Sequence, residues 1–477
     1  MLLPNDQHEP VFIDSIVLVS KGEEGNHNDQ VESGKQLCDQ QHQGNTSLMR
    51  AVFNLTKSAI GLGALFLPGN MKRMGLVGGV LMLVLGAVTC SLSLHFLART
   101  SHKHNVSDFF KMAHRVAGGR HASGVALALV LFQFGGLIAY ASFVGQYMAG
   151  FLSIVVKNRS NNTGGGFFTS PGFLSCVLCA VFIFPLSCMH DMRKIANASI
   201  AGMICVFYIF TLTVVDFLVD LGRGRTAGSE SITLFRLKSD FLNTFSNMVF
   251  AYVNHFTLVS LVPALKNRSW PRRAALIWSS SGIVTAVYVG MGVAGYLHFG
   301  NSVTPDILSA PAKPGIAYAL GRLAMSLVLI ASYPLQCDPT RTASDQLLLE
   351  FVNPNSWVSR NPRVRHYAWT LFFVFGPCLI AVTLRAYVMP ILEVFSSACG
   401  SLLVFILPPY YFLKLVGGGF RWTEMSSKPV SSGDTFNKVH GYERVLAYFN
   451  ICFGVVVLIG GTVGAVMDMI KKFSSMQ

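Results

Sequence analysis

Eleven mainly apolar segments follow one another along the chain, separated by polar connections. They cover residues 51–68, 76–97, 122–156, 171–187, 195–219, 240–265, 274–299, 316–336, 366–383, 387–413 and 445–467. Most are close to the ~20 residues that a helix needs to cross the hydrocarbon core of a bilayer. Runs such as 76–97 do not alternate polar and apolar positions, as the strands of a transmembrane barrel would. The pattern therefore predicts an all-α polytopic membrane protein with 11 transmembrane helices.

The placement of the charged residues supports this fold class. Charged side chains make up 13% of the chain, whereas soluble domains average about 25%. The apolar segments contain only Lys57, Asp216, Asp240, Arg322 and Glu393. Arg322 lies near the outer end of the eighth segment and Glu393 two turns into the tenth, and we interpret both as members of structural pairs rather than substrate ligands. An ordinary soluble protein is excluded.

The net charge of +14 reflects orientation in the membrane. Most Lys and Arg residues lie in alternate connections, and the loop 98–121 alone carries five of them. Because basic loops stay in the cytosol, we expect a cytosolic N-terminus, an outer C-terminus and contact with anionic lipid. The basic residues are scattered over several loops and do not gather on one face with aromatic residues, which argues against a nucleic-acid partner.

The polar ends define the expected domains. Residues 1–48 are polar and unperiodic and predict a disordered cytosolic tail; 49–470 form the transmembrane domain; 471–477 form a short outer tail. The loop 414–444 contains three successive glycines and is expected to be mobile. Two adjacent glycosylation sequons, starting at Asn158 and Asn161, fall in the predicted outer loop 157–170.

No pattern of residues indicates catalysis or metal binding. Seven of the ten cysteines lie within apolar segments and none lies in an outer loop, so no disulfide framework is expected. Cys176 and Cys179 are spaced like metal ligands, but they lie in an apolar segment without nearby histidines. We therefore expect no metal, no cofactor and no enzymatic activity.

The first apolar segment contains the features of a broken helix. Gly61 and Gly63 lie two residues apart near its centre, and Pro68 follows five residues later. Lipid cannot replace the lost backbone hydrogen bonds, so such a break must be buried in protein or face an aqueous cavity. A half-helix that starts there presents free N–H groups that suit a carboxylate. The alternative is a close helix contact through small residues, and Lys57 nearby favours binding.

A second break is predicted in the sixth segment, at Phe250-Ala251-Tyr252-Val253-Asn254-His255. Asn and His are costly at membrane depth unless they face a cavity or a partner. A five-plus-five inverted repeat plus one extra helix would pair helices 1 and 6 and make both discontinuous, although the two halves show no direct similarity. Two interpretations of His255 stay open: a coupling residue or a hydrogen-bonded interior histidine.

Lys57 also has two open interpretations. A lysine buried at mid-membrane either pairs with an acceptor or has a lowered affinity for its proton, and it could then carry a proton or replace a coupling cation. Alternatively its side chain extends to the cytosolic interface, ~10 Å away along the helix.

Six motifs, in this order, resemble the amino acid/auxin permease family, within the superfamily that has the leucine-transporter-like inverted repeat. The first is Phe53–Pro68 followed by Gly75, with its Gly-x-Gly core. The others are Asp108–Gly118, Phe250–His255, Phe299–Leu308, Ser332–Arg341 and Glu393–Gly400 followed by Phe405–Pro409. The resemblance covers nearly everything after residue 48.

The resemblance implies a secondary-active amino acid transporter that works by alternating access. It places the substrate carboxylate on the backbone of Gly61, Leu62 and Gly63, and the amino group near Phe250 and Ala251. We add Ser58 and Asn254 to this substrate set.

The resemblance also bears on the coupling ion. Sodium-coupled members carry Asn at the position of Lys57 and a hydroxyl residue near Ser332, whereas the proton-coupled branch carries a lysine. Coupling to H⁺ through Lys57, Ser332 and His255 is therefore expected, with Na⁺ left open.

The expected substrate is an amino acid, with neutral ones slightly favoured because no acidic partner for a cationic side chain is evident. The expected location is the plasma membrane or an endomembrane such as a vacuole or lysosome, and the oligomeric state is left open. The main alternative is a membrane sensor that binds amino acids and signals through the tail 1–48. A sodium-coupled symporter is a second alternative.

Overall fold

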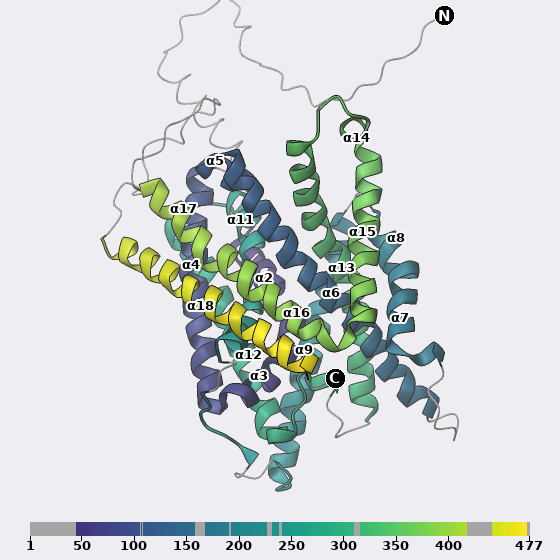
Figure 1. Cartoon of the computed structure of the whole chain (residues 1–477). Coiled ribbons are helices and arrows are strands. Elements are labelled where there is room, and N and C mark those ends of the chain that lie inside the picture. Colours follow the sequence, from purple (N-terminus) through teal and green to yellow (C-terminus); the bar gives the residue numbers. More distant parts are fainter. Residues whose placement is uncertain are drawn as a thin grey trace, which may run out of the picture. The chain divides into compact units, whose positions relative to one another are not determined.

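The computed structural model describes residues 44–104, 106, 108–157, 167–189, 192–226, 231–237, 241–309, 315–416 and 441–474. The predictions for the tail up to residue 43, for the two sequons and for most of the loop 414–444 lie outside these residues. Within the described part the chain is helical, and the one β-bridge there joins Thr46 to Leu265 (Figure 1).

In the first half of the chain, the helices are α2 (Leu48–Ala59), η1 (Leu62–Phe66), α3 (Leu67–Met74), α4 (Leu76–His104), α5 (Phe109–Ala117), α6 (Gly119–Lys157), η2 (Phe167–Thr169), α7 (Pro171–Leu178), η3 (Cys179–Ile183), α8 (Phe184–Ser187) and α9 (Met192–Gly222). In the second half they are α10 (Phe241–Phe250), α11 (His255–Ala264), α12 (Trp270–Phe299), η5 (Gly300–Ser302), η6 (Ile307–Ser309), α13 (Ile316–Phe351), α14 (Trp357–Arg360), α15 (Pro362–Thr383), η7 (Arg385–Tyr387), α16 (Val388–Phe395), η8 (Ser396–Gly400), η9 (Leu402–Ile406), α17 (Leu407–Val416) and α18 (Gly441–Ser474). The segments η3, η8 and η9 are π-helical turns within longer helical stretches.

Eight helices of the described part are long and apolar enough to cross a membrane, or nine if the bent pair Leu48–Ala59 and Leu62–Met74 is one span. Pro171–Ser187 and His255–Ala264 are shorter apolar helices. Each of the eleven predicted segments coincides with helical structure in the described residues. The helix α18 continues to Ser474, beyond the predicted end of the transmembrane domain at residue 470.

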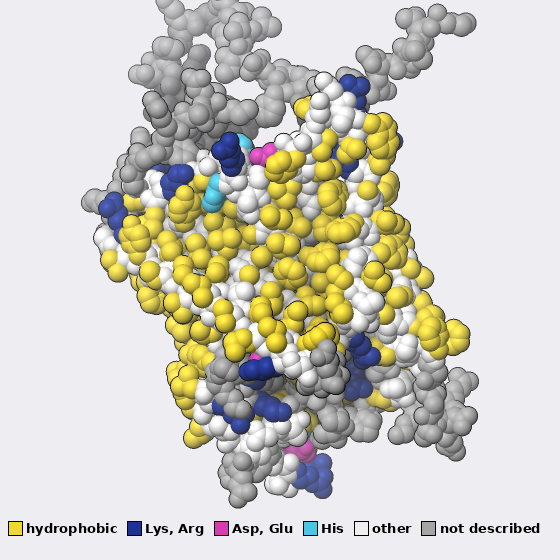
Figure 2. Space-filling view, viewed as in Figure 1, with side chains coloured by type: hydrophobic (Ala, Val, Ile, Leu, Met, Phe, Trp, Pro, Cys, Tyr) yellow, Lys and Arg dark blue, Asp and Glu magenta, His cyan; other side chains and the backbone are white. Residues whose placement is uncertain are grey.

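The surface shows why these helices belong in a bilayer. A broad band of apolar side chains surrounds the middle of the visible face, and Lys and Arg lie at its two ends (Figure 2). Exposed large side chains of this kind include Leu81 on α4, Phe182 on η3, Leu371 on α15 and Ile459 on α18, each at least half exposed. Such a continuous apolar surface would be insoluble in water and is stable against lipid.

Buried side chains form two large clusters, and the border between them falls at two helix breaks. The first half of α2 and most of α11 contribute to one cluster, together with α5. The end of α2, η1, α3 and α10 contribute to the other, together with much of α12. The chain therefore changes from one packed core to the other where α2 gives way to η1 and where α10 gives way to α11.

The helix α12 supports both parts of the first broken segment. On α2, the Thr56 hydroxyl donates to the Ser280 hydroxyl of α12 at 3.1 Å. Toward α3 the contact is through glycine: a Cβ on Gly292 would come within 2.6 Å of Met71, and one on Gly295 within 2.6 Å of Pro68. Glycine at these two positions therefore lets the Met71 and Pro68 side chains lie directly against the α12 backbone.

A short connection between α12 and α13 holds a buried carboxyl group. Asp306 is 3% exposed and accepts hydrogen bonds from the Leu308 N–H at 3.1 Å and the Ser309 hydroxyl at 2.9 Å. Burial raises the pKa of Asp306 from 3.8 to about 6, partly offset by these hydrogen bonds and by Arg322. The residue lies outside the helices that are long and apolar enough to cross a membrane.

The buried carboxyl group of Asp306 should make part of the protein's folding stability depend on pH. The folded protein binds the proton of the Asp306 carboxyl group more tightly than the unfolded chain does. The resulting stabilisation is complete below the pKa of Asp306 in the unfolded chain, and it is lost as the pH rises through the pKa of Asp306 in the folded protein. The shift of the Asp306 pKa from 3.8 to about 6 corresponds to on the order of 3 kcal/mol at most. We expect the melting temperature of the detergent-solubilised protein to fall between about pH 4 and pH 6.5 and Asp306→Asn to reduce that slope. Because Tyr147 and Arg322 face the carboxyl group, both stay unchanged in this comparison. An identical slope in the variant would contradict the assignment.

Candidate functional site

The first break lies between α2 and η1. The helix α2 ends at Ala59, and Ile60 has extended dihedral angles (φ −72°, ψ 109°). The two parts on either side differ in direction by 51°. Because the first N–H groups of a helix have no acceptor within it, those of Leu62 and Gly63 are available at the break. Pro68 follows in the first turn of α3, where its missing N–H costs no helical hydrogen bond.

The second break lies between α10 and α11. The helix α10 ends at Phe250, and a turn closed by the Tyr252 N–H on the Val249 carbonyl at 2.8 Å follows. The helix α11 begins at His255, after Asn254 with φ −132° and ψ 16°. The carbonyl of Ala251 therefore lies outside regular helix.

The two breaks are in direct contact. A Cβ built on Gly63 would lie 2.7 Å from the Ala251 Cβ, so the first break touches the second through its glycine backbone. Gly61 is different, because a Cβ there would meet nothing within 4 Å. The close approach thus requires glycine at position 63 and not at position 61.

Tyr288 of α12 joins the two breaks. Its hydroxyl lies 2.8 Å from the Ala59 carbonyl oxygen and 2.7 Å from the Ala251 carbonyl oxygen, and the side chain is completely buried. Its ring contacts the Tyr252 ring edge-on at 5.1 Å. The Tyr252 hydroxyl in turn donates to Thr285 of α12 at 3.3 Å. A row of polar groups on α12 therefore supports both broken segments.

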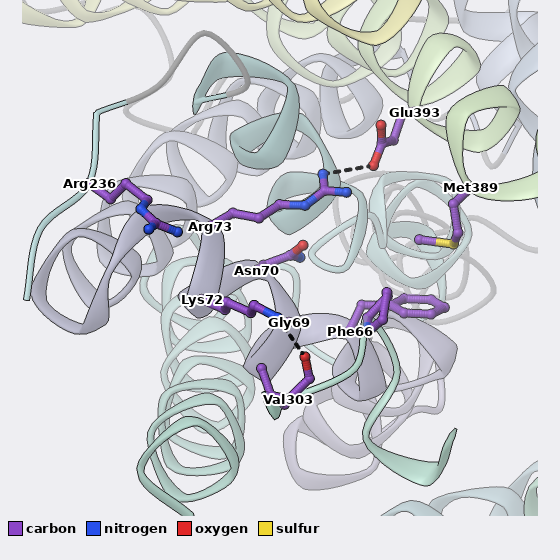
Figure 3. Close-up of a pocket in the computed structure, with 10 residues that line it drawn as sticks. Phe66, Gly69, Asn70, Lys72, Arg73, Arg236, Val303, Met389 and Glu393 are labelled. Atoms are coloured by element: carbon purple, nitrogen blue, oxygen red, sulfur yellow. Dashed lines mark hydrogen bonds and ion pairs between the residues drawn. The ribbon is translucent and has the colours of Figure 1, made fainter. Parts of the chain in front are cut away.

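Next to α3 lies a cavity of about 180 Å³, here called the α3 cavity. Its lining combines apolar and charged side chains: Phe66, Gly69, Asn70, Lys72, Arg73, Arg236, Val303, Pro305, Met389 and Glu393 (Figure 3). The Lys72 ammonium donates to the Val303 carbonyl at 3.2 Å. Three cations and one carboxylate give this cavity a positive balance that favours anionic groups.

Glu393 of α16 closes one side of the α3 cavity. It is 2% exposed, and the Arg73 guanidinium of α3 donates to its Oε1 at 3.2 Å (Figure 3). The side-chain amides of Asn243 and Asn247 on α10 donate to the same carboxylate at 2.7 Å each. The buried carboxylate thus connects α3 and α10 to α16, as the predicted structural pair requires.

Contacts at the opposite ends of the broken segments are made by the backbone. The Thr46 N–H, just before α2, donates to the Ala264 carbonyl of α11 at 3.0 Å. The Lys266 N–H donates to the Thr46 carbonyl at 2.9 Å. The start of α2 and the end of α11 are therefore tied together, as α3 and α10 are tied through Glu393.

The predicted substrate residues occupy different positions. Leu62 is buried at the break, as is Ala251 in the second break. The Ser58 side chain is exposed, and its hydroxyl donates to the Leu55 carbonyl of its own helix at 2.8 Å. Phe250 ends α10, and its side chain lies outside the described part.

The predicted coupling residues also lie on separate helices. Lys57 is partly buried in the last turn of α2, where the negative end of the helix dipole stabilises a cation. Ser332 is partly buried on α13. His255 is fully buried at the start of α11.

The hydrogen bonds of His255 define its tautomer. The Ser93 hydroxyl of α4 donates its one proton to the Val404 carbonyl, and Nε2 of His255 lies 3.2 Å from the Ser93 oxygen. Nε2 therefore carries the proton that Ser93 accepts, and Nδ1 is buried without a hydrogen-bond partner among the described residues. The side-chain oxygen of Asn254 is buried without such a partner as well.

Several residues of the site were not predicted from the sequence. Tyr288 is a polar residue within a long apolar run, and that was its only signal. Arg73, Asn243 and Asn247 carry no spacing that links them to Glu393, because they lie 146 to 320 residues away from it.

The long apolar helices, their lipid-type surface and the paired breaks define an integral multi-pass membrane protein with a site between broken helices. The chain belongs to the transmembrane amino acid transporter protein family, which it matches over residues 44–467. The family resemblance found in the sequence is thereby confirmed.

Similar curated proteins carry transporter names. Vacuolar amino acid transporter 7 of Saccharomyces cerevisiae is 26% identical over 332 residues, which are 68% of this chain and 64% of that protein. Amino acid transporter AVT6E of Arabidopsis thaliana is 25% identical over 88% of this chain and 83% of its own length. Sodium-coupled neutral amino acid transporter 7 of Rattus norvegicus is 23% identical over 61% and 63%. The chain thus spans less than two thirds of the length of the yeast relative and of the rat relative.

A solved structure shows a similar fold. MhsT in complex with L-phenylalanine superimposes with a TM-score of 0.55 at 13% sequence identity, covering 89% of this chain and 99% of that one. At this identity the likeness concerns the fold alone.

The contact between the breaks predicts a difference between two glycines. Gly63→Ala places a methyl group 2.7 Å from Ala251 and should separate the breaks, whereas Gly61→Ala meets open space. We expect amino acid uptake to fall about tenfold or more in Gly63→Ala and considerably less in Gly61→Ala. Uptake into proteoliposomes at equal protein density, with size-exclusion profiles as the folding control, measures this. Equal losses in the two variants would contradict the close contact.

The contacts of Glu393 predict that this residue limits the access of solvent to the α3 cavity. Glu393→Gln removes the charge that holds Arg73 and should let α3 and α10 separate from α16 more often. In an Asn70→Cys background, we expect a membrane-impermeant thiol reagent to label position 70 several-fold faster when Glu393 is Gln. The same two proteins with Asn70 retained give the background from native cysteines. A labelling rate that does not rise would show that the carboxylate does not close the cavity.

Proposed function

We propose that the protein is a secondary-active transporter of amino acids that works by alternating access. In this proposal the eleven helical segments form a five-plus-five inverted repeat with one additional helix, and the first and sixth are discontinuous. The substrate binds between the two breaks. The proposal goes beyond the family, whose name supports amino acid transport in general.

The observation that carries the proposal is the meeting of the two breaks. Free N–H groups at Leu62 and Gly63 suit the carboxylate of an amino acid, and carbonyl oxygens at Ala59 and Ala251 suit its ammonium group. Donors and acceptors of the two breaks therefore lie close together, because Gly63 touches Ala251. That arrangement matches the two charged groups that every α-amino acid carries, and it is independent of the side chain.

The positive α3 cavity supports a path to this site. Phe66 lines the cavity and belongs to η1, the helical turn that starts at the break. An amino acid whose carboxylate is attracted by the cations of the cavity would pass Phe66 to reach the N–H groups of Leu62 and Gly63. The Arg73–Glu393 pair would separate during entry on this side.

We propose protons as the coupling ion and Lys57 as the residue that carries them. Ser332 and His255 are proposed to take part in the same coupling. Lys57 is partly buried one turn before the first break, so its charge acts on the same carbonyl end that receives the substrate. Sodium coupling is the second candidate, and the name of the rat relative, a sodium-coupled neutral amino acid transporter, favours it. The substrate class proposed is neutral amino acids, since the described residues at the breaks include no carboxylate that would pair with a basic side chain.

The membrane and orientation are also proposals. The yeast relative is named as a vacuolar protein, which supports an endomembrane. We propose a cytosolic N-terminus, so that the α3 cavity opens on the luminal or extracellular side. Lys and Arg lie at both ends of the apolar band in Figure 2, so this orientation rests on the counts of basic residues in the loops.

Uptake of radiolabelled amino acids into proteoliposomes tests the function. We expect uptake that follows an imposed pH gradient and persists when sodium is replaced by choline. Binding without uptake of any amino acid, under any gradient, would overturn the transporter and favour a sensor. Uptake that needs sodium and ignores pH would transfer the proposal to sodium coupling.

In the same assay, Lys57→Gln separates coupling from binding. The variant keeps a polar side chain of similar length without the charge, so it should lose accumulation driven by the pH gradient and retain exchange of labelled for unlabelled amino acid. Retained pH-driven accumulation would count against Lys57 as the proton carrier.

A further inference from the structure

One wall of the α3 cavity is formed by the connection between α12 and α13. Val303 and Pro305 of this connection line the cavity, and the Lys72 ammonium of α3 donates to the Val303 carbonyl at 3.2 Å (Figure 3). A Cβ on Gly69 of α3 would lie 2.7 Å from the Pro305 carbonyl oxygen, so the two backbones touch. We call residues 303–309 the cap. The cap rests directly on α3, and its movement would change access to the cavity.

The cap carries a carboxyl group that is buried without an ion pair in the described part of the chain. Asp306 is 3% exposed, and its two oxygens accept hydrogen bonds from the Leu308 N–H and the Ser309 hydroxyl. The Arg322 guanidinium of α13 donates instead to the carbonyls of Leu308 at 2.8 Å and Gly150 at 3.3 Å. A buried carboxylate that lacks a direct counter-ion is costly, so the neutral form is favoured here.

A buried hydroxyl group faces the same carboxyl group. Tyr147 of α6 is 1% exposed, and its hydroxyl has no hydrogen-bond partner other than Asp306 among the described residues. A protonated carboxyl group has an O–H that needs an acceptor, and a tyrosine oxygen can accept it. The described groups that act on the charge of Asp306 are thus Tyr147, Arg322, Ser309 and the Leu308 N–H. These surroundings can hold a proton on Asp306.

We propose that Asp306 is a proton-binding site that controls the cap: the bound proton holds the cap closed on α3, and loss of the proton lets the cap open the α3 cavity. This inference rests on the proposed function, because it assigns a regulator to the path by which the substrate enters. The proton comes from the side on which the cavity opens and returns to that side. It regulates access and is separate from the proton proposed to be carried by Lys57.

The direction of the pH effect follows from burial. In the closed cap, burial raises the pKa of Asp306 from 3.8 to about 6. In an open cap the carboxyl group is solvated and returns to its ordinary pKa. The closed cap binds the proton more tightly, so it is favoured at low pH and loses this advantage as the pH rises through about 6. The two pKa values allow the ratio of open to closed caps to rise by about a hundredfold at most.

The test measures access to the α3 cavity in the detergent-solubilised full-length protein. Because Asn70 lines the cavity, the Asn70→Cys protein is labelled with a methanethiosulfonate reagent between about pH 4.5 and pH 7.5. It is labelled alone and in combination with Asp306→Asn, Ser309→Ala or Asp108→Asn. The same proteins with Asn70 retained give the background from native cysteines. Each rate is divided by that of the Asp306→Asn protein at the same pH, which removes the pH dependence of the thiol chemistry.

We expect the relative labelling rate of the Asn70→Cys protein to rise about tenfold or more over this range and to reach half of its final value near pH 6. Ser309→Ala removes a hydrogen bond to the charged carboxylate, so the curve should move to higher pH. Asp108 caps α5 with its side chain, and Asp108→Asn removes one carboxylate away from the cap. This control should leave the curve unchanged.

Each other outcome has a definite meaning. A relative rate that is the same at every pH, or that falls as the pH rises, overturns the proposal. A curve that Ser309→Ala does not move, or that Asp108→Asn moves equally, overturns it as well. If position 70 is not labelled at any pH, the cap does not open and the proposal fails.

The proposed function can fail independently of the cap. If labelling follows pH as expected but wild type takes up no amino acid, the proposed function is wrong while the proton site at Asp306 stands. Size-exclusion profiles show whether the variants are folded. If Asp306→Asn does not fold, the shift caused by Ser309→Ala, measured against the Asn70→Cys protein alone, decides the question.

Discussion

Backbone groups released by helix breaks need partners wherever water is scarce, and this requirement determines the centre of the protein. A carbonyl or N–H left without a partner in hydrocarbon costs several kcal/mol in general. Here the carbonyls of Ala59 and Ala251 both lie at the hydroxyl of Tyr288. The breaks persist because they are buried among α12 and each other, and because a third helix supplies a polar group at the same depth. The same requirement that makes the breaks costly suits them to the proposed ligand, which carries both donors and acceptors.

The helix α12 has two kinds of surface toward the broken segment, and each suits the part that it contacts. Toward α2 it offers hydroxyl groups, as in the Thr56–Ser280 hydrogen bond. Toward α3 it offers glycines, so that Met71 and Pro68 approach its backbone. The change from one surface to the other coincides with the border between the two buried clusters. One continuous helix therefore supports two half-helices that belong to different cores.

Much of the architecture could be predicted from local sequence, because span length and helix breaking depend on neighbouring residues. The apolar segments and the breaks near Gly61–Gly63 and 250–255 are of this kind. The contacts that distinguish Gly63 from Gly61 depend on Ala251, nearly 190 residues later, and no local pattern contains them. Tyr288 likewise acquires its role only when both breaks come to it. Glu393 was predicted as part of a pair, but its partners on α3 and α10 follow from packing.

The two ends of the broken segments are held by separate contacts of different chemistry. At one end, the Thr46 backbone ties the start of α2 to the end of α11. At the other, Glu393 ties α3 and α10 to α16 through Arg73 and two asparagines. Contacts on one side can break while those on the other side remain, since no hydrogen bond of this set is common to both. A site reached alternately from two sides needs separable closures of this kind, and the broken helices provide the joints between them. In the proposed function, the physical basis for alternating access would therefore lie in the same breaks that supply the proposed binding groups.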